Sequence, residues 1–214
     1  MSNDEARAVI EANAKALGPS LHAGMAVSLS AAGQRMRGLD HARYPHLLPL
    51  TMRVELREYL EREVLPNGWR VGGDSRAMGQ LLLQQPDLGM EMRFVKERRR
   101  SYPGGVPHAG KNGARRQRWA QDPLEFDIPG APTSVINPVN LLLCWDFASR
   151  EALDEFKLRI VHTLAPGSYG AAVPCDLILD VEDGGSIFSR LKFAGSDDDE
   201  DFFNVEISEE ENGS

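Results

Sequence analysis

A basic segment between residues 96 and 119 has the residue types with the clearest chemical potential in this sequence. Its one acid is Glu97. Its eight lysines and arginines are Lys96, Arg98, Arg99, Arg100, Lys111, Arg115, Arg116 and Arg118. Arginine suits phosphate because its planar guanidinium donates two parallel hydrogen bonds to phosphate oxygens. The segment therefore predicts a protein that contacts nucleic acid, either DNA or RNA, through its phosphate groups.

Aromatic residues in this segment could add contacts to the bases. Tyr102 and Trp119 flank its arginines, and flat rings of this kind stack on unpaired bases. Four glycines and two prolines from Pro103 to Gly113 predict a pliable loop without regular structure. The alternative is a solvated surface loop that pairs with the acidic tail of the same chain, residues 197–214.

Carboxylates just before the basic segment suggest a second kind of chemistry. A metal-dependent nuclease holds a divalent cation with two or three carboxylates and places a basic side chain near the phosphate. Asp74, Asp87, Glu91 and Lys96 are residues of those types. The gap from Asp87 to Glu91 is shorter than such sites need, and position 93 is an arginine. A metal-dependent nuclease is therefore the second alternative, and no metal is predicted.

Histidines offer a metal-free route to cleavage. A ribonuclease of that kind uses a histidine as base and arginines to stabilise the developing charge. His108, His162 and Tyr169 could supply such a set, although His162 lies on the apolar side of an expected strand. The sequence leaves open whether the protein is an enzyme, and it predicts no cofactor. The weak catalytic candidates are Asp87, Glu91, His108 and His162.

Residues 196–214 form an acidic tail that is expected to be disordered. The tail has nine of the chain's 32 acids and no base, so the remainder has 23 acids against 24 bases. Apolar residues interrupt the acids, as in "DFFNVEISEEE". A protein–protein adaptor or inhibitor that docks through residues 197–211 is therefore the first alternative. The tail could also compete with nucleic acid for the basic segment.

The bulk composition is that of a globular protein. The chain has 214 residues, 42% of them hydrophobic, and one domain is expected over residues 1–195. No apolar run approaches the ~20 residues of a membrane span, and the N-terminus lacks a secretory pattern, so a cytoplasmic protein without a membrane partner is expected. Cys144 and Cys175 lie in apolar runs, which predicts buried free thiols, with one disulfide as the alternative. The sequence indicates no oligomeric state.

Helices are expected in the first third of the chain. Apolar residues recur every three or four positions over residues 6–17, and Gly18-Pro19 should end that helix. A weaker helix over 21–36 and a short one over 76–85 are also expected. The clearest helix begins after Thr51 as N-cap. Its expected apolar stripe consists of Val54, Leu56, Tyr59, Leu60 and Val64.

Strands are expected in the rest of the chain, because apolar and polar residues alternate from residue 88 onward. The expected strands cover residues 69–71, 88–96, 141–147, 156–164 and 175–181, with a short segment, "IFSRLKF", after them. Helices that come first and strands that come later indicate an α+β fold. We therefore predict a helical N-terminal third packed on a mostly antiparallel β-sheet.

Overall fold

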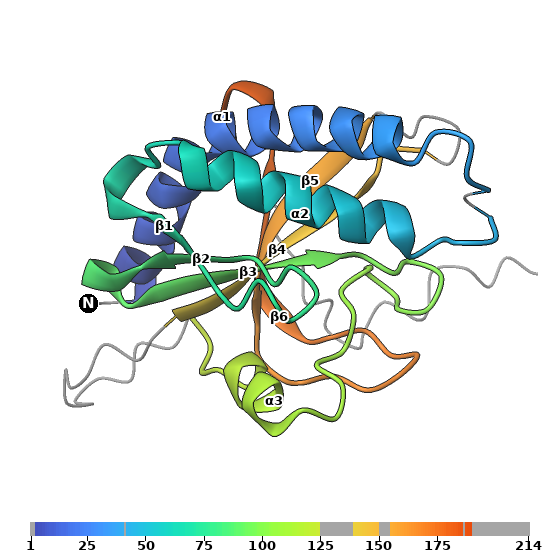
Figure 1. The fold of residues 1–214 in the computed structure, drawn as a ribbon. Coiled ribbons are helices and arrows are strands. Elements are labelled where there is room, and N and C mark those ends of the chain that lie inside the picture. The colour runs from blue at the N-terminus through green and yellow to red at the C-terminus, as the bar shows by residue number, and fades with distance from the viewer. Residues whose placement is uncertain (1–2, 41, 125–138, 150–154, 186, 190–214) are drawn as a thin grey trace, which may run out of the picture.

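The computed structural model describes residues 3–40, 42–124, 139–149, 155–185 and 187–189 (Figure 1). Within these ranges no helix is both long and apolar enough to cross a membrane. The helices are α1 (Asn3–Arg35), α2 (Leu47–Arg62) and α3 (Gly113–Trp119). The strands are β1 (Arg70–Gly72), β2 (Leu82–Gln85), β3 (Met90–Lys96), β4 (Val139–Phe147), β5 (Phe156–Thr163), β6 (Cys175–Val181) and β7 (Ile187–Ser189). The acidic tail lies outside the described residues.

The seven strands form one sheet in chain order, β1 to β7. Every neighbouring pair is antiparallel except β3 and β4, which run parallel from Met90 opposite Val139 to Lys96 opposite Trp145. The predicted α+β fold with a mostly antiparallel sheet is confirmed. A parallel pair needs a long crossover connection over one face of the sheet. The basic segment and α3 form the first part of that crossover, which explains their place in the fold (Figure 1).

Both faces of the sheet are covered. Helices α1 and α2 pack on one face, where Met25 and Leu56 join Met92, Trp145 and Ile160 in the main core (Figure 1). The basic segment, α3 and the connection after β5 cover the other face and form a smaller core. That smaller core contains Val106, Ala109, Trp119, Leu142, Cys144, Val161 and Val173. Because of this second layer, β5 is buried on both sides from Leu158 to Thr163.

Helix α1 continues through Gly18-Pro19, so the predicted end of the first helix is wrong. A proline inside a helix costs about 3 kcal/mol because it removes one backbone hydrogen bond. Leu17, Leu21 and Met25 are fully buried on one side of the helix and continue its apolar stripe past Pro19. Their burial, at roughly 1.5–3 kcal/mol per large side chain, outweighs the proline.

Helix α2 begins at Leu47, four residues before the predicted cap Thr51. Pro49 falls in its first turn, where the missing N–H has no helical partner to lose. The buried side chains are Leu48, Met52, Leu56 and Leu60. The predicted stripe was therefore wrong at two positions, because Val54 is 40% exposed and Val64 is 97% exposed.

Residues 76–85 do not form the predicted helix. Residues 82–85 are strand β2, which pairs with β1 as a hairpin and with β3 on its other side. Leu81, Leu82 and Leu83 are all at least 95% buried. Three consecutive buried residues suit a strand covered on both faces, which periodicity alone does not separate from a buried helix.

The two cysteines are free thiols, as predicted, and Cys144 is buried while Cys175 is half-buried. They lie on β4 and β6, with β5 between them. Burial raises the pKa of the Cys144 thiol well above its ordinary value. This thiol is therefore uncharged and unreactive at neutral pH.

Candidate functional site

Residues 97–112 of the basic segment contain no helix or strand, as their glycines and prolines predicted, but the segment packs against the sheet instead of projecting from it. Residues 113–119 form helix α3, and the side chain of Asn112 caps it by accepting a 2.9 Å hydrogen bond from the Arg115 backbone N–H. Val106, Ala109 and Trp119 are each at least 97% buried against the sheet. The fold therefore holds the arginines of this segment in fixed positions rather than on a pliable arm.

Glu97 anchors the start of the segment to the sheet. Its side chain is 2% exposed and pairs with Arg159 on β5, whose Nε lies 2.6 Å from Glu97 Oε1. Arg159 also donates from Nη2 to the Gly104 carbonyl at 2.7 Å. Arg99 Nη2 lies 2.7 Å from the other oxygen, Glu97 Oε2. This buried group of charges fixes the turn of residues 98–105 on the sheet.

The structure divides the eight predicted phosphate-binding bases into two groups. Three of them pair with carboxylates of the same chain. Lys96 Nζ lies 2.5 Å from Asp146 Oδ1 and over the Trp145 ring, while Arg99 pairs with Glu97 and Arg118 pairs with Glu91. The other five form no ion pair with the described part of the chain: Arg98, Arg100, Lys111, Arg115 and Arg116.

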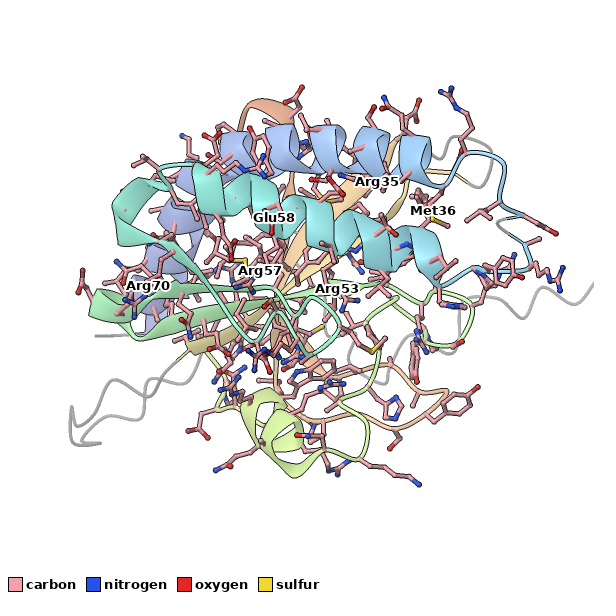
Figure 2. The ribbon with its side chains drawn as sticks, in the orientation of Figure 1. Arg35, Met36, Arg53, Arg57, Glu58 and Arg70 are labelled. Atoms are coloured by element: carbon pink, nitrogen blue, oxygen red, sulfur yellow. The ribbon has the colours of Figure 1, made fainter. Side chains whose placement is uncertain are left out.

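Arg115 and Arg118 belong to a group of four arginines drawn from three elements, which we call the arginine cluster. Arg93 on β3 and Arg115 and Arg118 on α3 line one shallow hollow together. Arg53 comes from α2 and donates to the Met78 carbonyl at 3.3 Å. Figure 2 shows Arg53 and Arg57 beside the turn that joins β1 and β2. The cluster therefore combines arginines of α2, β3 and α3 that lie close enough for their charges to act on one another.

One carboxylate, Glu91, lines the hollow with these arginines. Glu91 Oε1 accepts a 2.6 Å hydrogen bond from Arg118 Nη1, and Oε2 accepts a 3.0 Å hydrogen bond from Gln84. Both of its oxygens are thus engaged. Arg53, Arg93 and Arg115 form no ion pair among the described residues. The Nε atoms of Arg53 and Arg115 are buried there without a hydrogen-bond partner.

The charges of the cluster act on one another. Burial and, to a smaller extent, the charges of Arg115 and Arg118 together lower the pKa of Arg93 to about 10, while Glu91 offsets only part of the effect. Burial and the charge of Arg115 also lower the pKa of Arg53. A guanidinium pKa this low is exceptional, because arginine normally stays charged far above neutral pH. The cluster is a concentration of positive charge that the described protein does not neutralise.

The hollow itself is small. Its enclosed volume is about 10 Å³, and besides the charged residues it is lined by Trp119, Asn140, Leu141 and Leu142. That volume is about the size needed for one water molecule. Arg118, whose side chain is 49% exposed, stands at its rim. A larger anion would therefore bind at the mouth of the hollow, against the ends of the guanidiniums.

The predicted base-stacking role of Tyr102 and Trp119 does not fit the structure. Tyr102 is 2% exposed and Trp119 is 3% exposed, and Trp119 packs in the smaller core on the sheet. Tyr102 instead makes a 2.5 Å hydrogen bond between its hydroxyl and His108 Nδ1. Tyr169, at 79% exposed, is the open aromatic ring of this region and meets the rings of Tyr102 and His108 edge-on.

The weak metal and catalytic candidates do not come together. Asp74 caps the turn after β1 by accepting from the Arg76 backbone N–H, and Asp87 is exposed in the short turn before β3. Glu91 is committed to Arg118 and Gln84. In the described ranges, no three His, Cys, Asp or Glu side chains gather as a metal site would require. Residues 197–211, the predicted docking segment, lie outside those ranges.

His162 is buried, as its position in the strand pattern predicted, but its partner is a carboxylate. Its Nδ1 lies 2.6 Å from Asp176 Oδ1, and its side chain is 2% exposed. Asp176 lies at a bulge where the pairing of β5 and β6 shifts, and its Oδ2 accepts from the Leu124 N–H at 2.6 Å. Burial alone would raise the pKa of Asp176, but the hydrogen bonds from His162 and Leu124 hold it below its usual value.

We expect Asp176→Asn to lower the free energy of unfolding by about 1–3 kcal/mol at pH 7, because it replaces the acceptor of two buried hydrogen bonds. A carboxylate whose pKa is lowered by folding stabilises the protein above its unfolded pKa, near 4, and that contribution disappears as the pH falls through the lower folded value. Urea unfolding of both proteins at pH 7 and pH 3 measures this. If the two proteins differ in free energy of unfolding by the same amount at pH 7 and pH 3, the charged form of Asp176 does not stabilise the fold.

A larger hollow of about 670 Å³ lies on the opposite side of α2, lined by residues of α1 and α2. Both of its bases are paired, Arg35 with Glu55 at 2.6 Å and Arg62 with Glu58 at 3.3 Å, and Glu63 gives this hollow an excess of one acid. The arginine cluster instead has an excess of positive charge, because its four arginines have one nearby carboxylate, Glu91. For that reason we place the candidate site at the cluster.

Sequence reasoning found Arg115 and Arg118 but missed Arg53 and Arg93. Arg93 occupies an alternate position in a strand, and Arg53 lies in an amphipathic helix with many charged neighbours, so both match a solvated face. In the sheet, Arg93 stands opposite Leu142 of β4, on the side that the crossover covers. The strand sequence "MEMRFVK" shows only that Arg93 alternates with apolar residues. Neither residue is distinctive without the tertiary contacts.

No protein-family model matches the chain, and no curated protein or solved structure matches it either. The fold and the site geometry are therefore the basis for any functional conclusion. They define an α+β protein with an unneutralised arginine cluster beside a crossover connection.

Proposed function

We propose that this protein binds nucleic acid through the arginine cluster, assisted by the exposed bases of the basic segment. The observation that carries the proposal is the imbalance at the hollow, where Arg93, Arg115 and Arg118 share one carboxylate that is already engaged. Arg116 and Lys111 add exposed charge on and just before α3. A phosphate is the anion that such a set of forked donors fits.

The arginines of the cluster repel one another in the free protein, and a bound phosphate would relieve that repulsion. Like charges held together in partly buried surroundings disfavour the charged form, as the lowered pKa of Arg93 indicates. An anion would supply the missing countercharge and accept hydrogen bonds from the guanidinium ends. Charge-assisted hydrogen bonds of this kind are about twice as strong as neutral ones.

We expect an electrophoretic shift with single- or double-stranded nucleic acid that weakens steeply as salt increases. If three phosphates are neutralised on a duplex, the slope of log affinity against log salt is about −2.7. The double variant Arg115→Gln/Arg118→Gln should reduce that slope by about two and weaken binding to every sequence. Titrations at several salt concentrations between about 50 and 200 mM measure both effects.

The matched control is Arg35→Gln/Arg62→Gln, which removes two surface arginines on the α1 and α2 side, where each pairs with a glutamate. Its total charge change equals that of the test variant. Equal losses in both variants would mean that net charge alone governs binding. That result, or the absence of any salt-sensitive binding in the unaltered protein, would refute the proposal.

A further inference from the structure

We infer that the arginine cluster takes the terminal phosphate of a nucleic acid, a phosphomonoester, in preference to the phosphodiester groups along the strand. The inference rests on the proposed function and names the ligand group of the same site.

Three arginines of the cluster line a single hollow instead of being spread along a groove. Arg93 from the sheet and Arg115 and Arg118 from α3 line the same hollow. A surface that tracks a strand presents its bases along a groove, because each diester carries one charge and successive phosphates are spread along the backbone. Three guanidiniums at one hollow suit a single group with more than one charge.

The number of charges favours a monoester. Four arginines act on one another here, and Glu91 is the one carboxylate among the residues that line the hollow. Because Glu91 already accepts from Arg118 and Gln84, it leaves Arg93 and Arg115 without a direct partner among the described residues. A phosphomonoester has a charge of about −1.5 to −2 at pH 7 and three free oxygens, whereas a diester has one charge and two free oxygens.

The shape of the hollow favours a chain end. It encloses about 10 Å³, so a phosphate would lie at its mouth and not inside it. Trp119, Leu141 and Leu142 form apolar parts of its lining. A terminal phosphate can point its three oxygens at the mouth while its single ester bond leads away to solvent. A diester would have to bring both of its sugars against the rim.

The test compares one single-stranded oligonucleotide in three forms, with a 5′-phosphate, a 3′-phosphate or neither, by fluorescence anisotropy with the full chain. We expect one or both phosphorylated forms to bind about tenfold tighter than the unphosphorylated form, and inorganic phosphate to compete with them. Arg93→Met should abolish the difference between forms. Arg93→Lys keeps the charge without the fork and should retain part of it. Arg62→Gln is the control and should retain all of it.

The outcomes separate this inference from the proposed function. Equal, salt-sensitive binding of all three forms would overturn the inference and leave the proposed function standing. Binding of inorganic phosphate, measured by calorimetry, without binding of any oligonucleotide would overturn both the proposed function and this inference. A terminal-phosphate preference that persists in Arg93→Met would show that another site recognises the end, which also overturns the inference.

Discussion

Glu97→Gln is expected to lower the free energy of unfolding by about 3–5 kcal/mol, because it leaves a buried arginine without its countercharge. Arg159 has 5% of its side chain exposed and pairs with Glu97 through Nε and Nη2. Glutamine keeps the size of the side chain but removes the charge that Arg159 and Arg99 share. Urea denaturation at pH 7 with linear extrapolation measures the change.

The matched control is Glu58→Gln, the same chemical change in an exposed ion pair. Glu58 pairs with Arg62 at 3.3 Å, and their side chains are 56% and 77% exposed. Its loss should cost less than about 1 kcal/mol. The double variant Glu97→Leu/Arg159→Met should recover most of the lost stability, since apolar residues can replace a buried pair. Similar small losses in both single variants would show that Glu97 does not anchor the crossover.

Arg93→Met is expected to change stability and binding in opposite directions. It should raise the free energy of unfolding at pH 7 by about 1–2 kcal/mol, because it removes a charge that burial and two neighbouring arginines disfavour. The same substitution should weaken binding of phosphate-bearing ligands tenfold or more, since it removes one fork of the cluster. Urea unfolding and a salt-resolved binding titration on the same samples measure both effects.

The pH dependence gives a second readout. Arg93 has a pKa of about 10 in the folded protein, well below the ordinary value of an arginine. A base whose pKa is lowered by folding destabilises the protein at every pH below the folded value, and the penalty is relieved as the pH rises above about 10 toward the ordinary value. The advantage of Arg93→Met should therefore be full at pH 7 and shrink above pH 10. A variant that loses both stability and binding would mean that Arg93 has a structural role instead.

The periodicity of apolar residues is a local property of the sequence, so it predicts single helices and strands. The alternation in "MEMRFVK", "FKLRIVHT" and "CDLILDV" predicted β3, β5 and β6 correctly, because a repeat of two is a local property of a strand. The end of α1 at Pro19 and the helix over 76–85 were wrong, because the packing of distant residues overrode the local preference. Local signals predict elements, and tertiary burial decides their limits.

The candidate site divides in the same way. The sequence alone shows that the basic segment contains arginines, whose guanidinium groups suit phosphate. Two of these arginines, Arg115 and Arg118, belong to the cluster. Only the tertiary structure brought Arg53 and Arg93 beside them and placed Tyr102 and Trp119 inside. The reason is the parallel pairing of β3 and β4, which requires a crossover and lays α3 against the sheet next to β3. A pairing between strands far apart in the chain leaves no mark on the spacing of the residues that it brings together.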